Sequence, residues 1–269
     1  MTENMLAKVP RPSFTITWVA GLIAVIACIL TFSDDQNEAL WGNLTIGMTS
    51  AMSVGMGALL LSKRASLGPE RRAYVALVMA LSFWFSAWML WSYYELAFGA
   101  GPYPSPADAL WLAGYGLSIY YVVWAYRKAS SRLLESRLIS LFLTTIIVSV
   151  IIAIFLFPLI GFTLGAGGDW PALSISLAYP ILDGVLLAMA ILTIVSLRPG
   201  KNPQFAPSAM IMAAILAAVI ADTGYGYGAV TDSQLLEEQD RIWDAFYNAA
   251  YLCIAGALYW KYMLYSKSE

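Results

Sequence analysis

The chain has 269 residues, of which 60% are hydrophobic and 12% are charged, and its formal net charge is −2. Soluble domains carry about 25% charged residues, so this composition excludes an ordinary soluble protein, and the small negative charge gives no reason to expect a nucleic-acid partner. The chain has no histidine, and neither of its two cysteines has a partner at metal-ligand spacing, so haem, zinc, copper and iron sites are disfavoured and we expect no metal and no cofactor.

Eight apolar stretches are each long enough to cross about 30 Å of hydrocarbon as a helix. They lie near 14–32, 41–62, 73–97, 105–126, 138–162, 170–197, 206–227 and 242–264. The longest segment between them, about 228–241, is short and polar, and we expect a surface connection there. The sequence therefore predicts an all-α integral membrane protein, a bundle of eight transmembrane helices that forms a single transmembrane domain over residues 1–269.

Basic residues give this bundle a direction. Eight crossings place both ends of the chain on one side, and with the N-terminus inside, every lysine and arginine except Arg241 falls in a cytoplasmic segment. An excess of Lys and Arg in short loops marks the cytoplasmic side of a membrane protein. We therefore expect a multi-pass protein of the cytoplasmic membrane of the cell, with the lipid bilayer as its surroundings and both termini in the cytoplasm.

Five carboxylates belong to the outer halves or the midplane of the predicted spans: Glu95, Asp108, Asp183, Asp222 and Asp244. An ionised carboxylate at the bilayer centre costs about 2.5 to 3.5 kcal/mol and usually faces the interior of a bundle. These acids therefore predict a polar pocket that is open to the exterior. Asp108 and Asp244 have an alternative explanation, since each begins a span and an acid is stabilised by the helix dipole there. Asp183 lies more than ten residues inside its span and has no such explanation.

A repeat organises the spans. Segments 108–115 and 244–251 both begin with Asp-Ala and end with Tyr, and seven residues are two helical turns, so each Asp shares a helix face with its Tyr. Segment 179–183 of span six places a tyrosine four residues before an aspartate. The pattern predicts three hairpin repeats, spans three and four, five and six, and seven and eight, which run in the same direction, with spans one and two as an addition.

Aromatic residues accompany the carboxylates. Trp84, Trp88, Trp91 and Glu95 fall on one stripe of span three. Aromatic faces beside a carboxylate attract organic cations by about 0.5 to 2 kcal/mol per contact, so we expect the pocket to bind a small cationic or polar ligand. Besides the five carboxylates, the predicted ligand-binding residues are Trp88, Trp91, Tyr115, Tyr179, Tyr225 and Tyr251. The alternative is that these rings only fill the space between helices.

Segments 104–115, 179–183, 221–222 and 243–244 together resemble the multi-span N-terminal membrane modules of bacterial signalling proteins of the GGDEF and EAL type. The resemblance covers spans three to eight. It implies a sensory role in a prokaryotic cytoplasmic membrane, because such modules are regarded as sensors. No cyclase or phosphodiesterase sequence follows span eight, so we expect this chain to act through a partner signalling protein.

Three other functions stay open. A cation-coupled carrier or channel fits the midplane carboxylate and the parallel repeats, although the inner halves of the spans offer no polar path. An accessory subunit of a larger membrane complex fits the small-residue face of span two. An enzyme is the least favoured, because no nucleophile and base are paired and 221–224 is not the Gly-x-Gly-Asp motif of intramembrane aspartyl proteases. We assign no catalytic residue.

Overall fold

The computed structural model describes residues 12–32, 37–99, 103–129, 144, 170–196, 205–231 and 233–266. These residues form seven long helices and no strand, which confirms the all-α prediction for the described part of the chain. The helices are α2 (Pro12–Phe32), α3 (Glu38–Leu61), α5 (Arg71–Phe98), α6 (Pro106–Ala129), α8 (Trp170–Ser196), α9 (Phe205–Thr231) and α10 (Ser233–Tyr265). A short helix α4 (Arg64–Leu67) and a 3-10 turn η2 (Gly68–Glu70) connect α3 to α5. The fifth predicted span, 138–162, lies outside the described residues except for residue 144.

Several of these helices have the length and composition of membrane spans. Five segments meet both criteria among the described residues: Thr15–Phe32, Glu38–Leu61, Gly68–Phe98, Ala178–Ser196 and Phe205–Tyr225. Helices α6 and α10, with 24 and 33 residues, are also long enough but do not meet the composition criterion. The chain is therefore a helical protein with several membrane-type helices, whereas the eight crossings and their orientation stay predictions.

The connection predicted at about 228–241 is wrong. Helix α9 continues to Thr231 and α10 begins at Ser233, so nearly the whole segment is helical. Its Leu, Glu and Gln residues have high helix propensity, and it contains no proline and only one glycine. Polarity suggested a loop, but here it marks helix that extends beyond the apolar part of the two spans.

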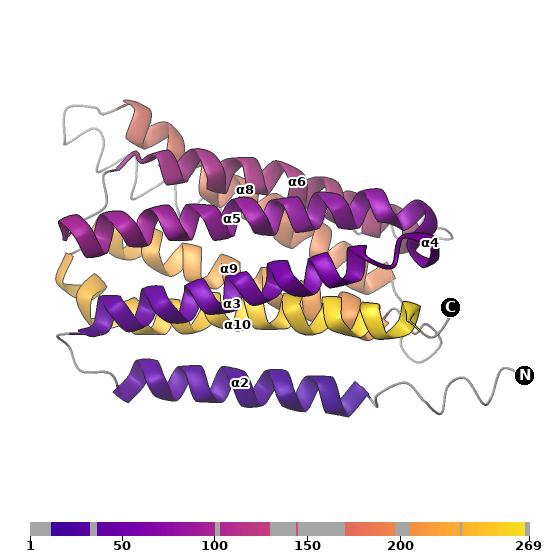
Figure 1. The fold of residues 1–269 in the computed structure, drawn as a ribbon. Coiled ribbons are helices and arrows are strands. Elements are labelled where there is room, and N and C mark those ends of the chain that lie inside the picture. Colours follow the sequence, from indigo (N-terminus) through magenta and orange to yellow (C-terminus); the bar gives the residue numbers. More distant parts are fainter. Residues whose placement is uncertain are drawn as a thin grey trace, which may run out of the picture.

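Six of the helices pack as a closed ring. In order around the ring, α3 contacts α5, then α6, α8, α9 and α10 follow, and α10 returns to α3. Helix α2 lies outside this ring against α10 and α3 (Figure 1). The start of α2 and the end of α10 lie at the same end of the bundle as α4 (Figure 1). Side chains that point into the ring therefore meet partners from helices that are far apart in the sequence.

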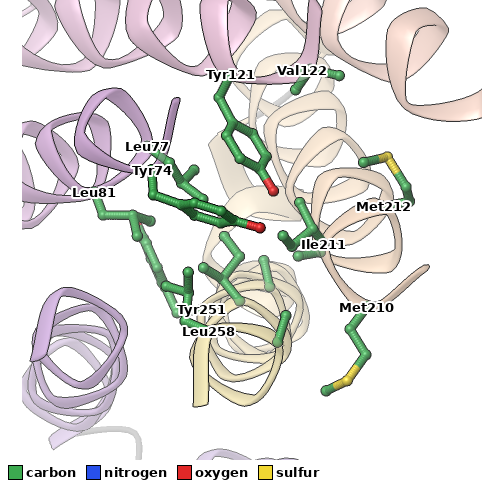
Figure 2. Close-up of a cluster of buried hydrophobic side chains, with 14 of the residues drawn as sticks. Tyr74, Leu77, Leu81, Tyr121, Val122, Met210, Ile211, Met212, Tyr251 and Leu258 are labelled. Carbon is green, nitrogen blue, oxygen red and sulfur yellow. The ribbon is translucent and has the colours of Figure 1, made fainter. Parts of the chain in front are cut away.

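The half of the ring nearer to α4 is filled by apolar and aromatic side chains (Figure 2). Tyr74 and Leu77 of α5, Tyr121 of α6, Ile211 of α9 and Leu258 of α10 are all nearly inaccessible to solvent. Burial of one such side chain contributes about 1.5 to 3 kcal/mol in water, and in a membrane the same close contacts supply packing energy. This core holds the helices in place, and the same helices contribute the polar side chains in the other half of the ring.

Candidate functional site

Two aspartates from different helices converge on one tyrosine. The Tyr115 hydroxyl of α6 lies 2.6 Å from Asp183 Oδ1 of α8 and 3.0 Å from Asp222 Oδ2 of α9. Because both carboxyl groups contact the same hydroxyl group, they lie close to each other. Tyr115 is 5% exposed and Asp183 is 4% exposed, so both lie in the interior of the ring.

A second tyrosine completes the group. The Tyr247 hydroxyl of α10 donates a hydrogen bond to Asp222 Oδ1. Asp183, Asp222, Tyr115 and Tyr247, which we call the acid–tyrosine network, thus join α6, α8, α9 and α10. Four consecutive helices of the ring contribute one member each, so the network depends on the assembled bundle and not on any single hairpin.

The number of protons in the acid–tyrosine network limits its chemistry. A phenol carries one proton and donates one hydrogen bond, yet the Tyr115 oxygen lies beside two carboxyl oxygens. The ion pairs of the described helices, Lys128 with Glu70 and Arg241 with Glu38, do not include Asp183 or Asp222. Two adjacent carboxylates without a basic partner repel each other in an apolar interior. One additional proton or one bound cation therefore satisfies both the contacts and the charge.

Asp108 has a local structural role in addition to any other. Its Oδ2 accepts hydrogen bonds from Ser105 N at 2.6 Å and Ser105 Oγ at 2.9 Å, and its own N–H donates to Ser105 O. This reciprocal arrangement caps the start of α6, where Pro106 occupies the first helical position. Its other oxygen, Oδ1, accepts from the Tyr179 hydroxyl of α8 at 2.7 Å. Asp108 therefore lies in the first turn of its helix, as the alternative explanation from the sequence expected, and it also accepts a hydrogen bond from a tyrosine.

Asp244 makes a similar contact on the other side of the ring. Its Oδ1 accepts a hydrogen bond from the Tyr225 hydroxyl of α9 at 2.8 Å. Its Oδ2 faces Gly42 of α3 so closely that a Cβ at position 42 would clash with it. Asp244 is 9% exposed and lies well inside α10, which begins at Ser233. The explanation of Asp244 as an acid at the beginning of its helix is therefore wrong.

Glu95 belongs to a separate polar group between α5 and α3. Its Oε2 accepts a hydrogen bond from Asn43 Nδ2 at 2.6 Å, and Asn43 Oδ1 accepts one from Ser92 Oγ at 2.5 Å. Asn43 also donates to the carbonyl of Ala39 within its own helix. Glu95 is thus held by α3, and its hydrogen bond joins a different pair of helices from those of the acid–tyrosine network.

Aromatic rings pack against the acid–tyrosine network and against each other. The Trp88 ring lies 5.1 Å from the Tyr247 ring and 5.5 Å from the Trp111 ring, and the Trp91 ring lies 5.9 Å from that of Trp111. Trp88 Nε1 donates a hydrogen bond to the Tyr251 hydroxyl at 3.0 Å. Tyr251 therefore binds an indole, whereas Tyr115, the residue at the matching position of the other repeat segment, binds carboxyl groups.

The sequence-predicted residues thus fall into several groups. Asp183, Asp222 and Tyr115 lie together. Asp108 with Tyr179 and Asp244 with Tyr225 form two adjoining pairs, because the Tyr179 ring lies 6.0 Å from that of Tyr115 and the Tyr225 ring lies 5.8 Å from that of Tyr247. Glu95 belongs to a separate group. Sequence reasoning did not include Tyr247 in the site, although its place three residues after Asp244 on the same helix face was the available signal. It also missed Asn43, for which no pattern in the sequence was informative. The outward-facing pocket itself stays a prediction.

Among the described residues, no cluster of three or more His, Cys, Asp or Glu side chains has the arrangement of a metal site. No family model, curated protein or solved structure matches this chain. The resemblance to bacterial sensor modules therefore stays an expectation from the sequence, and the functional argument depends on the site itself.

Proposed function

We propose that this protein is a membrane sensory module that binds a small cation at the acid–tyrosine network. Binding changes the arrangement of the helices, and a partner protein responds to that change. The observation that carries the proposal is the convergence of Asp183 and Asp222 on Tyr115, without a Lys or Arg bonded to either acid in the described helices. Among the described residues, such a site lacks one positive charge. A proton satisfies it in the free state, and a cation that replaces the proton satisfies it in the bound state.

The surroundings favour a cation with N–H donors. Carboxyl and phenol oxygens accept hydrogen bonds from an ammonium group, and charge-assisted bonds of this kind are the strong ones. The faces of Trp88 and Trp111 beside Tyr247 attract a cationic carbon chain through cation–π contacts. A small primary ammonium ion therefore fits the chemistry better than an anion or an apolar ligand.

A sensor requires that binding changes the bundle. Because the members of the acid–tyrosine network come from α6, α8, α9 and α10, a cation that rearranges their hydrogen bonds shifts the relative stability of two helix arrangements. The family resemblance of the sequence supports the same role, with a partner signalling protein as the receiver.

A carrier is the second candidate, and the position of Asp183 near the middle of α8 favours it. Against it, the ring on the α4 side of the network is filled by apolar side chains such as Leu186, Ile211 and Leu258. A cation in transit would have to open this core.

The test measures the thermal stability of the purified full chain in detergent with sodium, ammonium, methylammonium or tetramethylammonium chloride. We expect methylammonium to raise the midpoint of unfolding of the wild type, but not that of Asp183→Asn or Asp222→Asn. Glu70→Gln makes the same carboxyl-to-amide change at the α4 end of the bundle and should keep the response. A response that survives in both aspartate variants, or no response to any cation, contradicts the proposal.

Two further measurements separate the sensor from its alternatives. The carrier predicts methylammonium flux into proteoliposomes that is lost in Asp183→Asn, and the sensor predicts none. Copurification from native membranes distinguishes the remaining roles, because a stoichiometric signalling protein supports sensing, whereas a large enzyme complex supports the accessory role.

A further inference from the structure

One buried hydroxyl group of α6 has no hydrogen-bond partner. Ser118 is 4% exposed, and its Oγ atom forms no hydrogen bond among the described residues. Other buried hydroxyl groups of the ring are bonded: Ser92 of α5 donates to the carbonyl of Trp88, and Thr193 of α8 donates to that of Met189. A buried hydroxyl group without a partner costs free energy, and such groups are commonly explained by a bound water, ion or ligand.

The hydroxyl group of Ser118 is directed into the ring. The buried residues of α6 lie on one face, which includes Tyr115 one turn before Ser118, and Tyr121 and Val122 one turn after it. Figure 2 shows Tyr121 directed from α6 towards Tyr74 of α5, in the interior of the ring. Ser118 lies between these residues on the same face, so the missing partner belongs to the interior of the ring and not to the outer surface of α6.

The position of Ser118 also brings it to the acid–tyrosine network. Residues three apart on a helix have Cβ atoms about 5 to 6 Å apart, and helical side chains lean towards the N-terminus, so Ser118 leans towards Tyr115. The Tyr115 hydroxyl in turn contacts Asp183 and Asp222. Two carboxyl groups without a basic partner in the described helices thus lie beside a hydroxyl group whose donor and acceptor are both unused.

These two features together select the class of ligand. A second carboxylate on the ligand is disfavoured, because Asp183 and Asp222 would repel it, and a plain alkyl chain would leave Ser118 unpaired. A hydroxyl group is neutral and both donates and accepts, so it satisfies Ser118 without adding charge. An ammonium and a hydroxyl group joined by two carbon atoms, with a hydrogen bond of about 2.8 Å at each end, span about 9 Å, which exceeds the separation of the two positions along α6.

We propose that the ligand of the acid–tyrosine network is a small amino alcohol of the 2-aminoethanol type, whose ammonium group binds Asp183 and Asp222 and whose hydroxyl group binds Ser118. This inference rests on the proposed function, since it names the class of cation that the same site takes. Ser118 is then the residue that distinguishes an amino alcohol from an alkylamine. A site with a buried polar partner discriminates against an analogue that lacks the matching group, because the partner is left unpaired.

The experiment compares 2-aminoethanol with propylamine, two ligands of almost equal shape that end in a hydroxyl and a methyl group. The midpoint of thermal unfolding of the purified full chain in detergent is measured against the concentration of each hydrochloride, and of methylammonium chloride. For the wild type, 2-aminoethanol should reach half-saturation at about one tenth of the concentration that propylamine needs, as expected for one hydrogen bond. In Ser118→Ala the two concentrations should become equal, while the response to methylammonium is unchanged.

Thr193→Val is the matched control, because it removes a buried hydroxyl group that is bonded within α8. It should keep the preference for 2-aminoethanol, and an equal loss of preference in this variant would overturn the proposal. Without any amine, Ser118→Ala should keep the unfolding midpoint of the wild type, since its hydroxyl group has no bond to lose. A clearly lower midpoint would mean that Ser118 already has a partner in the free protein, which contradicts the assignment.

The possible failures are distinguishable. If methylammonium stabilises the wild type but 2-aminoethanol and propylamine have equal half-saturation, the acids bind a cation and this inference alone is wrong. A preference for 2-aminoethanol that persists in Ser118→Ala assigns the hydroxyl group of the ligand to another residue and also refutes it. If no amine stabilises the protein, the proposed function itself fails. If Ser118→Ala does not fold, the wild-type comparison of the two ligands decides.

Discussion

Asp183 and Asp222 lie against the same hydroxyl group, that of Tyr115, at 2.6 and 3.0 Å. The three residues belong to α8, α9 and α6, so one phenol connects three helices of the ring. Removal of that hydroxyl group tests how much the connection contributes to the fold.

Tyr115→Phe should lower the free energy of unfolding by about 1 to 3 kcal/mol, because the carboxyl groups beside it lose the one hydrogen bond that the phenol donates. Tyr120→Phe is the control on the same helix, since Tyr120 is 50% exposed, and it should change the stability by less than about 0.5 kcal/mol. Denaturant titration of both purified variants measures the difference. Equal effects would mean that the Tyr115 hydroxyl has no special part in stability.

Two glycines of α6 give a second matched pair. A Cβ at Gly114 would clash with Nε1 of Trp84, whose indole donates a hydrogen bond to the carbonyl of Trp111. Gly114→Ala should therefore destabilise the protein by about 1 to 3 kcal/mol. A Cβ at Gly116 would meet open space, so Gly116→Ala should be neutral or stabilising by up to about 1 kcal/mol, through helix propensity. Thermal unfolding compares the stability of the two variants. A Gly116→Ala variant that is less stable than Gly114→Ala would refute the described packing of α5 on α6.

Asn248 joins α10 to α3. It is 1% exposed, its Oδ1 accepts a hydrogen bond from Thr49 at 2.8 Å, and its Nδ2 donates to Thr45 at 3.1 Å. Asn248→Ala leaves both threonines without this partner and should cost about 1 to 3 kcal/mol. Ser86→Ala, which removes an exposed hydroxyl bonded within α5, is the control and should have little effect. A small effect of Asn248→Ala on chemical denaturation would argue that α3 is held by other contacts.

The predicted orientation is tested by cysteine labelling in intact cells. In a background without the native cysteines (Cys28→Ala, Cys253→Ala), Tyr103→Cys should react with a membrane-impermeant maleimide, and Arg72→Cys should react only after the cells are opened. Both positions are exposed, so accessibility within the protein does not separate them. The opposite pattern would reverse the assignment of inside and outside.

The helices were predictable from the sequence because their signal is local. Apolar runs of sufficient length indicated each of the seven described helices. The polar stretch where α9 ends and α10 begins was misjudged, because polar composition alone does not distinguish helix from loop. Side-chain partners were harder to predict. Tyr115 and Tyr251 occupy matching positions, yet one binds two aspartates and the other binds Trp88, since the neighbouring helices differ.

The surroundings of the charged residues were predicted only in part, because they too depend on which helices are neighbours. The depth of Asp183 in its span indicated an internal polar contact, but the identity of its partners depends on the order of helices around the ring. The sequence placed Lys261 with the other basic residues in a cytoplasmic segment, whereas packing of α10 within the bundle leaves this residue only 4% exposed. A single sequence contains neither of these long-range arrangements explicitly.

Protons and cations should compete for the acid–tyrosine network. As the pH falls, protons occupy the carboxylates, so stabilisation by methylammonium should decrease, and it should increase as the pH rises. A series of melting curves at several pH values, each with and without methylammonium chloride, measures this dependence, and Asp183→Asn should show none. A response that grows at low pH would contradict competition.

The most direct measurement of this exchange is an infrared difference spectrum of the purified protein, with methylammonium minus without, in the region of the carboxylic-acid C=O stretch. If the cation replaces a proton shared by Asp183 and Asp222, the spectrum loses a protonated-carboxyl band and gains carboxylate bands, and Asp183→Asn and Asp222→Asn abolish this difference. A spectrum without carboxyl changes at saturating methylammonium, or one that is the same in both variants, would contradict the account.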